Sequence, residues 1–261
     1  MKIHSTAIIY PKAKLSETVE IGPYTIIGEN VEIGDNTKIS SSVVIEGNTK
    51  IGKNNILSVG VVIGTPPQDV KYKGETSYLE IGDNNVIREY VTIHKGTGEG
   101  GKTIIGNDNF IMTYSHIGHN CIVGNEITMV NYAALGGYVI VEDKAVISAF
   151  AAIHQFCRIG RLAMIGASSK LVKDVPPYLI ADGHPLAIYG LNSVGLKRRN
   201  VPLEIRHNLE NAYKIIYRSD LNLSQAIAKI ETEIPKSEEI NHFIEFLKTS
   251  KRGICLDTSM R

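Results

Sequence analysis

Two histidines, His116 and His119, are the side chains of this sequence best suited to moving a proton, and they lie close together in the segment 114–121. An imidazole titrates near neutral pH, so it can serve as a general base at pH 7. Neutral imidazoles are also zinc ligands, and His154 could complete a set of three with one position left open. The pattern predicts either general-base catalysis or a metal site, against the ordinary alternative of exposed surface histidines.

A regular repeat must position these histidines. Aliphatic residues recur at every sixth position from 3 to 63, from 81 to 93 and from 105 to 171, without a polar member. A small or β-branched residue, such as Ser115 or Cys121, stands four positions after most of them and predicts a second inward column. Three hexads form one coil of roughly 18 residues. We therefore predict a mainly β fold, a left-handed parallel β-helix of hexapeptide repeats, in which glycines such as Gly118 permit sharp corners.

Stacking of these coils predicts an open notch beside His119. In a strand with alternating side chains, His116 lies between two inward residues and must point outward. Gly136 and Gly137 stand one coil after Gly118 and His119, so no side chain fills the space above the imidazole. The same columns two coils on hold His154 and Gln155.

The repeat also divides the chain into two parts. It is interrupted by excursions near 65–80 and 95–103 and stops near Pro176, so we expect the β-helix over 1–184. The apolar residues of 185–261 follow helical spacing, which predicts a C-terminal α-helical domain that covers the open end of the β-helix.

Three helices are expected in that domain. Pro202 is a plausible first helical residue, because its missing N–H has no helical partner there. Two more amphipathic segments cover 223–234 and 237–248, the second opening on Ser237 as a capping residue.

Composition excludes several classes of protein. The 261 residues carry a net charge of +1, which gives no electrostatic footprint for nucleic acid. No apolar run is long enough to cross a bilayer and the N-terminus lacks an apolar signal segment, so we expect a cytoplasmic protein without membrane insertion. Cys121 and Cys157 fall two coils apart in one inward column, at about 10 Å, which is too far for a disulfide.

Three charged or glycine-rich segments could bind anions. The segment 96–101 could be taken for a phosphate loop, but no helix N-terminus follows it, so a plain loop is favoured. The run 197–199 is either a solvated helix end or a site for pyrophosphate. A basic cluster either aids solubility or docks an acidic partner. It consists of Arg158, Arg161, Lys170 and Lys173.

Seven segments carry a resemblance to a known family. They are 67–72, 93–97, 115–119, 153–157, 173–178, 195–199 and 212–218. The most specific are His-Gln-Phe-Cys at 154–157 and Asp-Val-Pro-Pro-Tyr at 174–178. Together they resemble the acyl-[acyl-carrier-protein]–UDP-N-acetylglucosamine O-acyltransferases, hexapeptide-repeat enzymes that begin lipid A biosynthesis. The resemblance spans nearly the whole chain.

The resemblance implies an activity and its residues. His119 would be the general base that takes the proton of the 3-hydroxyl of UDP-N-acetylglucosamine, while the amide of Gly137 would face the oxyanion. The acyl donor would be acyl carrier protein, and the enzyme would be a homotrimer that needs no metal and no cofactor. The sugar and donor site would include Asp69, Lys71, His116, His154 and Gln155. Ala167 would limit acyl length, and the nucleotide end would include Asn192, Arg198 and Arg199.

Three positions depart from the family pattern. Asn120 stands where many members carry Asp, Tyr138 where they often carry His, and Val194 where they carry an acidic residue. Some relatives accept a 3-amino sugar, so N-acylation is an alternative. Three further alternatives for this chain are a zinc enzyme of the γ-carbonic anhydrase type, a later N-acyltransferase of the same pathway, and an inert spacer without affinity for UDP sugars.

Overall fold

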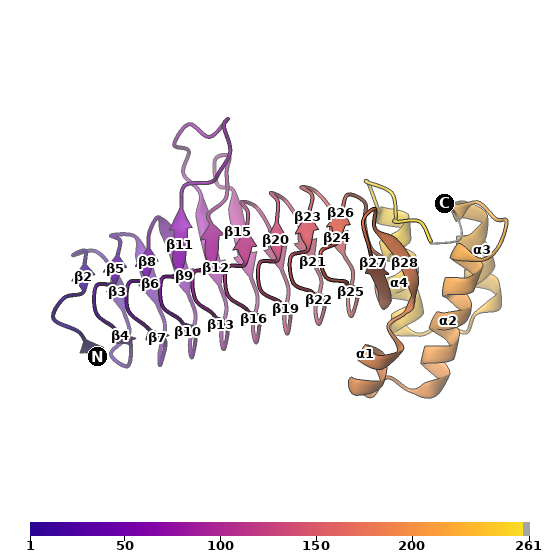
Figure 1. Ribbon diagram of the computed structural model, residues 1–261, viewed down its shortest axis with the longest axis horizontal. Helices are drawn as coiled ribbons and strands as arrows, with labels where there is room; N and C mark the ends of the chain where they lie inside the picture. Colours follow the sequence, from indigo (N-terminus) through magenta and orange to yellow (C-terminus); the bar gives the residue numbers. More distant parts are fainter. Residues whose placement is uncertain (258–261) are drawn as a thin grey trace.

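Short parallel strands wind into a long triangular prism in the computed structural model, which describes residues 1–257 (Figure 1). Three sheets run along the prism: sheet A has 11 strands, sheet B has 9 and sheet C has 8. Each strand pairs with its equivalent in the next coil, as Ile117 does with Leu135. The predicted left-handed parallel β-helix is confirmed.

Most strands are two residues long, because the chain turns a corner at every hexad. Sheet A contains β1 (Lys2–Ile3), β4 (Glu20–Ile21), β7 (Lys38–Ile39), β10 (Ile56–Leu57), β13 (Val86–Ile87), β16 (Phe110–Ile111), β19 (Thr128–Met129), β22 (Val146–Ile147), β25 (Met164–Ile165), β27 (Leu179–Asp182) and β28 (Ala187–Leu191). Sheet B contains β2 (Ile8–Ile9), β5 (Ile26–Ile27), β8 (Val44–Ile45), β11 (Val62–Thr65), β14 (Thr92–His94), β17 (His116–Ile117), β20 (Ala134–Leu135), β23 (Ala152–Ile153) and β26 (Lys170–Leu171). Sheet C contains β3 (Lys14–Leu15), β6 (Val31–Ile33), β9 (Asn48–Ile51), β12 (Tyr78–Ile81), β15 (Lys102–Ile105), β18 (Ile122–Val123), β21 (Ile140–Val141) and β24 (Arg158–Ile159).

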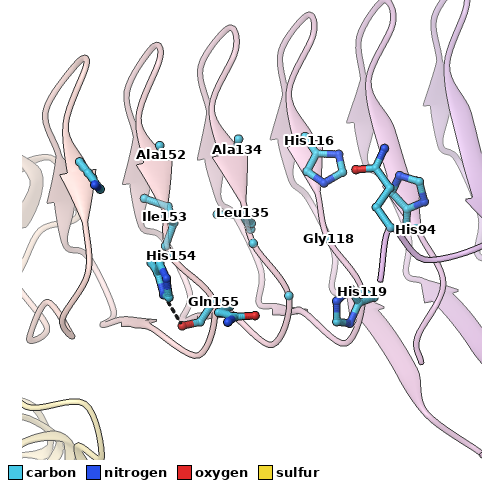
Figure 2. A pocket seen from close by; sticks show the side chains of 14 residues that line it. His94, His116, Gly118, His119, Ala134, Leu135, Ala152, Ile153, His154 and Gln155 are labelled. Carbon is cyan, nitrogen blue, oxygen red and sulfur yellow. Dashed lines mark hydrogen bonds between the residues drawn. The ribbon is translucent and has the colours of Figure 1, made fainter. Parts of the chain in front are cut away.

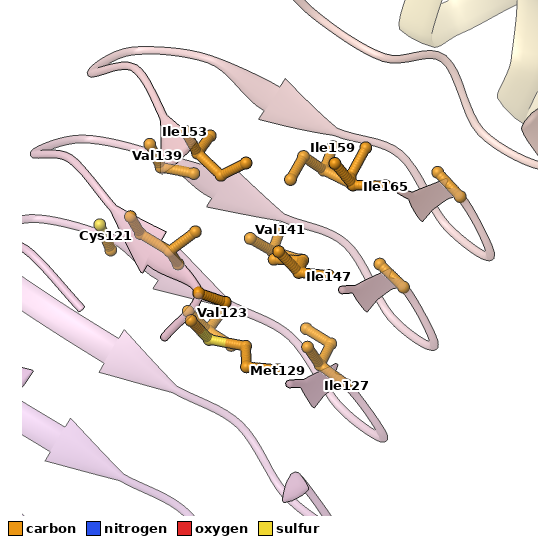
Figure 3. Close-up of a cluster of buried hydrophobic side chains, with 14 of the residues drawn as sticks. Cys121, Val123, Ile127, Met129, Val139, Val141, Ile147, Ile153, Ile159 and Ile165 are labelled. Carbon is orange, nitrogen blue, oxygen red and sulfur yellow. The ribbon is translucent and has the colours of Figure 1, made fainter. Parts of the chain in front are cut away.

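The two inward columns form the core of the prism. Figure 3 shows Val123, Val141 and Ile159 stacked along one sheet, beside the second column of Cys121 and Val139. All five are at most 1 % exposed, so both predicted columns are confirmed here. The first coil differs from the prediction: Ile3 is 41 % exposed, and Ile9 and Leu15 are only partly buried, because no earlier coil covers them.

The corners turn for a different reason than the sequence suggested. Non-glycine residues supply the left-handed conformation, as at Tyr114 (φ 59°), Asn120 (φ 58°) and Tyr138 (φ 61°). Gly118 is not among the positive-φ residues, and a Cβ there would lie 2.8 Å from the carbonyl oxygen of Leu135. Close approach of the next coil, rather than conformational freedom, therefore requires this glycine.

A ladder of buried asparagines lies at the start of three successive strands of sheet A. The amide N–H of Asn85 donates to Oδ1 of Asn55 at 2.9 Å, and that of Asn109 donates to Oδ1 of Asn85 at 3.0 Å. Each Nδ2 donates to a backbone carbonyl of a neighbouring coil. All three side chains are therefore satisfied, which removes the cost of burying them.

Both excursions leave the prism at the corner between sheets B and C, and Figure 1 shows them projecting together. The first connects β11 to β12 and the second connects β14 to β15. They are bonded to each other, since the N–H of Gly100 donates to the carbonyl of Thr76 at 2.8 Å. The N–H of Thr76 donates in turn to Oε2 of Glu99 at 3.2 Å.

Within residues 1–257, a hairpin and four helices follow the last coil, one helix more than the three predicted. β27 and β28 pair antiparallel, so the predicted boundary at 184/185 falls in the turn between them. The helices are α1 (Ser193–Arg198), α2 (Leu203–Tyr217), α3 (Leu223–Glu233) and α4 (Glu238–Thr249). Pro202 is the N-cap of α2, not its first helical residue as predicted, because its ψ of 147° is extended. The end of the predicted domain, 258–261, lies outside the described residues.

Helix α4 lies across the C-terminal end of the prism. The ring of His242 bridges the two parts, with Nδ1 3.0 Å from the hydroxyl of Tyr178 and Nε2 2.9 Å from Oε2 of Glu142. The Arg158 guanidinium lies 4.2 Å over the ring of Phe246. Among residues 1–257, none of the helices has the length and apolar character needed to cross a bilayer.

Candidate active site

A cavity of about 470 Å³ opens on the outer face of sheet B, over β17, β20, β23 and β26. Alternation places His116, Ala134, Ala152 and Lys170 on this face. The two alanines leave room above the His116 imidazole, which a larger side chain would fill. Figure 2 shows the histidines and Gln155 around this space. The remaining lining residues are Gln68, His94, Gly118, His119, Leu135, Gly136, Gly137, Ile153 and His154.

The half-buried imidazole of His119 is held in one tautomer by the next residue. Its Nδ1 lies 2.9 Å from Oδ1 of Asn120. A carboxamide oxygen only accepts hydrogen bonds, so Nδ1 carries the hydrogen and Nε2 keeps its lone pair. The rings of His119 and Tyr138 pack nearly perpendicular to each other, with ring centroids 5.3 Å apart. Neutral His119 is therefore arranged to accept a proton at Nε2.

Gly137 lies against the same ring nitrogen. A Cβ at this position would stand 2.5 Å from Nε2 of His119, so any larger residue would displace the imidazole. The N–H of Gly137 has no acceptor within residues 1–257, whereas the N–H of Tyr138 donates to the carbonyl of His119 at 2.9 Å. A proton acceptor and an unpaired amide donor thus line one cavity, as acyl transfer requires.

His116 is neutral at physiological pH. Burial lowers its pKa to about 4, and the electrostatic effect of the neighbouring His94 and His119 adds to the shift. Nδ1 lies 2.8 Å from the hydroxyl of Thr92, one coil away. His116 can therefore hydrogen-bond a ligand without adding a positive charge.

Sequence reasoning missed His94 as a site residue. It is 8 % exposed, and its Nδ1 donates to the carbonyl of Pro66 at 2.8 Å, which fixes the base of the first excursion at the cavity wall. The ring lies 5.3 Å from that of His116. The second excursion hid this neighbour, because Thr92 and His116 pair across 24 positions instead of 18. A signal was present: His94 follows the in-phase Ile93, as Gly118 follows Ile117.

His154 and Gln155 line the cavity just after β23, one coil before Lys170 (Figure 2). Both are exposed, and Nδ1 of His154 lies 3.2 Å from the carbonyl of Gln155. The structure thus brings together five predicted site residues on one chain. They are His116, His119, Gly137, His154 and Gln155.

Comparison with known proteins identifies the family. A family model described as UDP N-acetylglucosamine O-acyltransferase, domain 2, matches residues 174–255. The acyl-[acyl-carrier-protein]–UDP-N-acetylglucosamine O-acyltransferase of Thermodesulfovibrio yellowstonii is 52 % identical over 97 % of this chain and 99 % of its own. That of Thiobacillus denitrificans is 46 % identical over 97 % and 98 %. The chain belongs to this family of enzymes.

A solved member of the family has the same architecture. The crystal structure of a UDP-N-acetylglucosamine acyltransferase from Bacteroides fragilis superposes with a TM-score of 0.95 at 47 % identity, covering 96 % of this chain and 98 % of that one. The family comprises left-handed β-helices with C-terminal helices, as found here. The chain is therefore an acyltransferase, which agrees with the resemblance drawn from its motifs.

Two predicted positions lie on the first excursion, outside the cavity lining of this acyltransferase. The carboxylate of Asp69 accepts the N–H of Lys71 at 2.9 Å and shapes a turn there. Their neighbour Gln68 does reach the lining. Ala167 is exposed at the corner between sheets A and B.

The positions expected at the nucleotide end lie at another edge of the prism, the corner between sheets C and A. Asn192 caps α1, accepting the N–H of Gly195 at 3.0 Å, and its Nδ2 donates to the carbonyl of Leu162 at 2.8 Å. Arg199 forms an ion pair with Glu126. Arg198 is exposed beside it. On one chain, these residues do not meet the cavity of sheet B.

The basic cluster is smaller than the sequence suggested. Arg158 pairs with Glu142 at 3.3 Å, and Arg161 pairs with Glu238 of α4 at 2.8 Å. Folding brings these acids to the arginines from the preceding coil and from α4. Lys170 and Lys173 form no ion pair among the described residues.

Other reactive side chains give no second candidate chemistry. No three His, Cys, Asp or Glu side chains of residues 1–257 converge in a metal-binding arrangement, so the geometry does not favour the zinc alternative. Cys121 is buried, and burial raises the pKa of its thiol to about 12. The same cause raises the pKa of Cys157 to about 11, so neither thiol is a ready nucleophile.

Proposed function

We propose that this enzyme transfers a (3-hydroxy)acyl chain from acyl carrier protein to the 3-position of UDP-N-acetylglucosamine in the cytoplasm, the first step of lipid A biosynthesis. The names of two relatives that match nearly the whole chain support both substrates. One observation carries the chemistry: Asn120 holds His119 with Nε2 unprotonated, beside the unpaired amide of Gly137.

His119 acts as the general base in this proposal. The sugar 3-hydroxyl gives its proton to Nε2 as its oxygen attacks the thioester carbonyl. The tetrahedral oxyanion accepts the N–H of Gly137, and its collapse expels the carrier thiolate, which takes the proton back from His119. Oδ1 of Asn120 accepts the Nδ1 hydrogen throughout. The products are the 3-O-acyl sugar nucleotide and the free carrier thiol.

The other predicted residues bind the substrates. The acidic acyl carrier protein docks on Lys170 and Lys173, which have no ion-pair partners among residues 1–257. Asp69, Lys71, His116, His154 and Gln155 contact the sugar and the donor. The side chain of Ala167 limits acyl length, because each excluded methylene costs about 0.8 kcal/mol.

The active unit is a homotrimer with a site between each pair of prisms. Asn192, Arg198 and Arg199 lie at the corner of sheets C and A, while the cavity lies on sheet B. A neighbouring chain can present one corner to the other's cavity, and a triangular prism suits closed threefold packing.

Histidine variants test this function. We expect His119→Ala to lose roughly 10²–10⁴-fold in kcat, because the base acts only in the transition state. His116→Ala and Gln155→Ala should lose both kcat and affinity. Near-normal turnover by His119→Ala would overturn its role as base.

Product analysis tests the substrates. The purified enzyme is incubated with acyl carrier protein thioesters of several chain lengths and either UDP-N-acetylglucosamine or its 3-amino analogue. We expect an ester on the 3-oxygen of the natural sugar. Amide formation with the analogue alone would favour N-acylation, and no affinity for either nucleotide would favour the inert spacer.

A further inference from the structure

The glycine-rich segment 96–101 forms hydrogen bonds with the side chain of Asn120. The N–H of Thr97 donates to Oδ1 of Asn120 at 2.9 Å, and Nδ2 of Asn120 donates to the carbonyl of Thr97 at 3.2 Å. The backbone N–H of Asn120 donates to the hydroxyl of Thr103 at 2.8 Å. A single loop residue thus recognises both ends of the carboxamide.

Two glycines allow the loop to close this tightly. A Cβ at Gly101 would stand 2.1 Å from the carbonyl oxygen of Thr97 and 3.0 Å from Nδ2 of Asn120. A Cβ at Gly96 would stand 2.5 Å from the carbonyl group of Gly101. Gly98 is different, because a Cβ there would meet nothing within 4 Å. Space is therefore limiting where the loop meets Thr97 and Asn120, and not at its tip.

The two hydrogen bonds with Thr97 decide which way the carboxamide of Asn120 faces. As bound, Oδ1 points to Nδ1 of His119 and keeps the hydrogen on that nitrogen. If the amide group rotated by about 180°, its NH₂ would face Nδ1 and favour the tautomer with hydrogen on Nε2. That tautomer could not accept a proton at Nε2. Thr97 opposes the rotation, because a rotated amide would place its NH₂ against the Thr97 N–H and its oxygen against the Thr97 carbonyl.

We infer that the loop 96–101 is a positioning element for catalysis: through Thr97 and Gly101 it fixes the Asn120 carboxamide and thereby selects the tautomer of His119. The inference rests on the proposed role of His119 as base. The loop is matched to Asn, because an Asp at position 120 would offer no hydrogen to the Thr97 carbonyl and would repel it. The loop is also braced against Thr76 of the first excursion by the N–H of Gly100.

Nitrogen NMR of the histidine rings tests the inference directly. Long-range ¹⁵N–¹H spectra of histidine-labelled full-length enzyme distinguish the two neutral tautomers, and His119→Gln assigns the signal. We expect the Nδ1–H form in the wild type and mainly the Nε2–H form in Gly101→Ala and in Asn120→Ala. kcat should fall by roughly tenfold to a hundredfold in Gly101→Ala.

Gly98→Asn is the matched control, since Asn tolerates positive φ and the site is open. It should keep the wild-type tautomer and kcat. An unchanged tautomer in Gly101→Ala would overturn the inference, whether or not Asn120→Ala changes it. If both variants change the tautomer and both stay fully active, the loop does position His119 and it is the proposed general base that fails.

Discussion

At the scale of single residues, His116 makes stability depend on pH. Its pKa is about 4 in the folded enzyme and about 6.5 in an unfolded chain, so the unfolded state binds more protons between these values. The free energy of unfolding therefore falls as pH drops through this window, by up to about 3 kcal/mol from this group. His116→Gln should lose less stability than the wild type between about pH 7 and about pH 4.5.

Urea unfolding at the two pH values measures the difference. The exposed His207 of α2 supplies the control, because His207→Gln should follow the wild type. Equal acid-induced losses in the wild type and His116→Gln would contradict the prediction.

Gly137 tests the packing of the base. In Gly137→Ala the methyl group would lie 2.5 Å from Nε2 of His119, so the ring must turn away. We expect kcat to fall by about 10²-fold, the cost of misplacing a reacting group, with little change in the free energy of unfolding. Gly124→Ala is a suitable control, since its methyl group would collide with the Asp143 carboxylate at another corner. Full activity in Gly137→Ala would show that catalysis does not depend on the observed position of the His119 ring.

At the scale of elements, His242 fixes α4 to the prism. Burial acts to raise the pKa of Glu142, but hydrogen bonds from His242 and from the Arg161 amide outweigh it, so its pKa is lowered and the carboxylate is charged. His242→Ala would leave this carboxylate and the Tyr178 hydroxyl short of a partner, at a cost of about 1–3 kcal/mol.

Glu238→Ala removes a neighbouring ion pair of the same helix as a control. Its side chain is 77 % exposed, so the cost should stay below about 1 kcal/mol. Urea denaturation of both variants measures the two losses. A larger loss for Glu238→Ala than for His242→Ala would contradict the assigned role of His242.

The hexad repeat made the strands predictable, because an aliphatic residue at every sixth position marks where each strand points into the core. The repeat sets the phase of His116 and predicts the stacking of Gly137 over His119. It could not reveal the role of Gly118, because contact with the carbonyl of Leu135 depends on how closely coils approach. The prediction for Pro202 was wrong by one position, because the fixed φ of proline suits both the N-cap and the first helical residue.

The site was less predictable wherever the repeat is interrupted. Gln68 lies on the first excursion and His94 just before the second, where spacing along the chain no longer gives spacing in the prism. The ion pair of Arg161 with Glu238 joins parts of the chain 77 positions apart, which local patterns do not report. The sequence marked Asn120 as a departure from the family pattern, and the structure places its Oδ1 2.9 Å from Nδ1 of His119.

At the scale of the whole molecule, a shared site predicts complementation between inactive variants. His119→Ala lacks the base, and the paired substitution Arg198→Ala and Arg199→Ala lacks the nucleotide contacts. If each site takes the base from one chain and the arginines from its neighbour, randomly mixed trimers should regain about one intact site in four. Activity is measured after the two variants are unfolded together and refolded.

Sedimentation of the wild-type enzyme measures the mass of the assembly in solution, which should equal that of three chains. Refolding each variant alone is the control and should give no activity. A mixture that stays inactive while trimers form would show that each chain carries a complete site.

The asparagine ladder has a consequence for how the chain finds its own pairing. Nearly identical coils offer a folding chain many almost equivalent alignments, each displaced by one full turn. Displacing the chain by one turn would set Asn55 or Asn109 against an unsuited neighbour, and a buried amide would then lose its acceptor. The asparagines thereby distinguish three coils in the middle of the prism from the others. A misaligned form is destabilised more with every asparagine that lacks its partner.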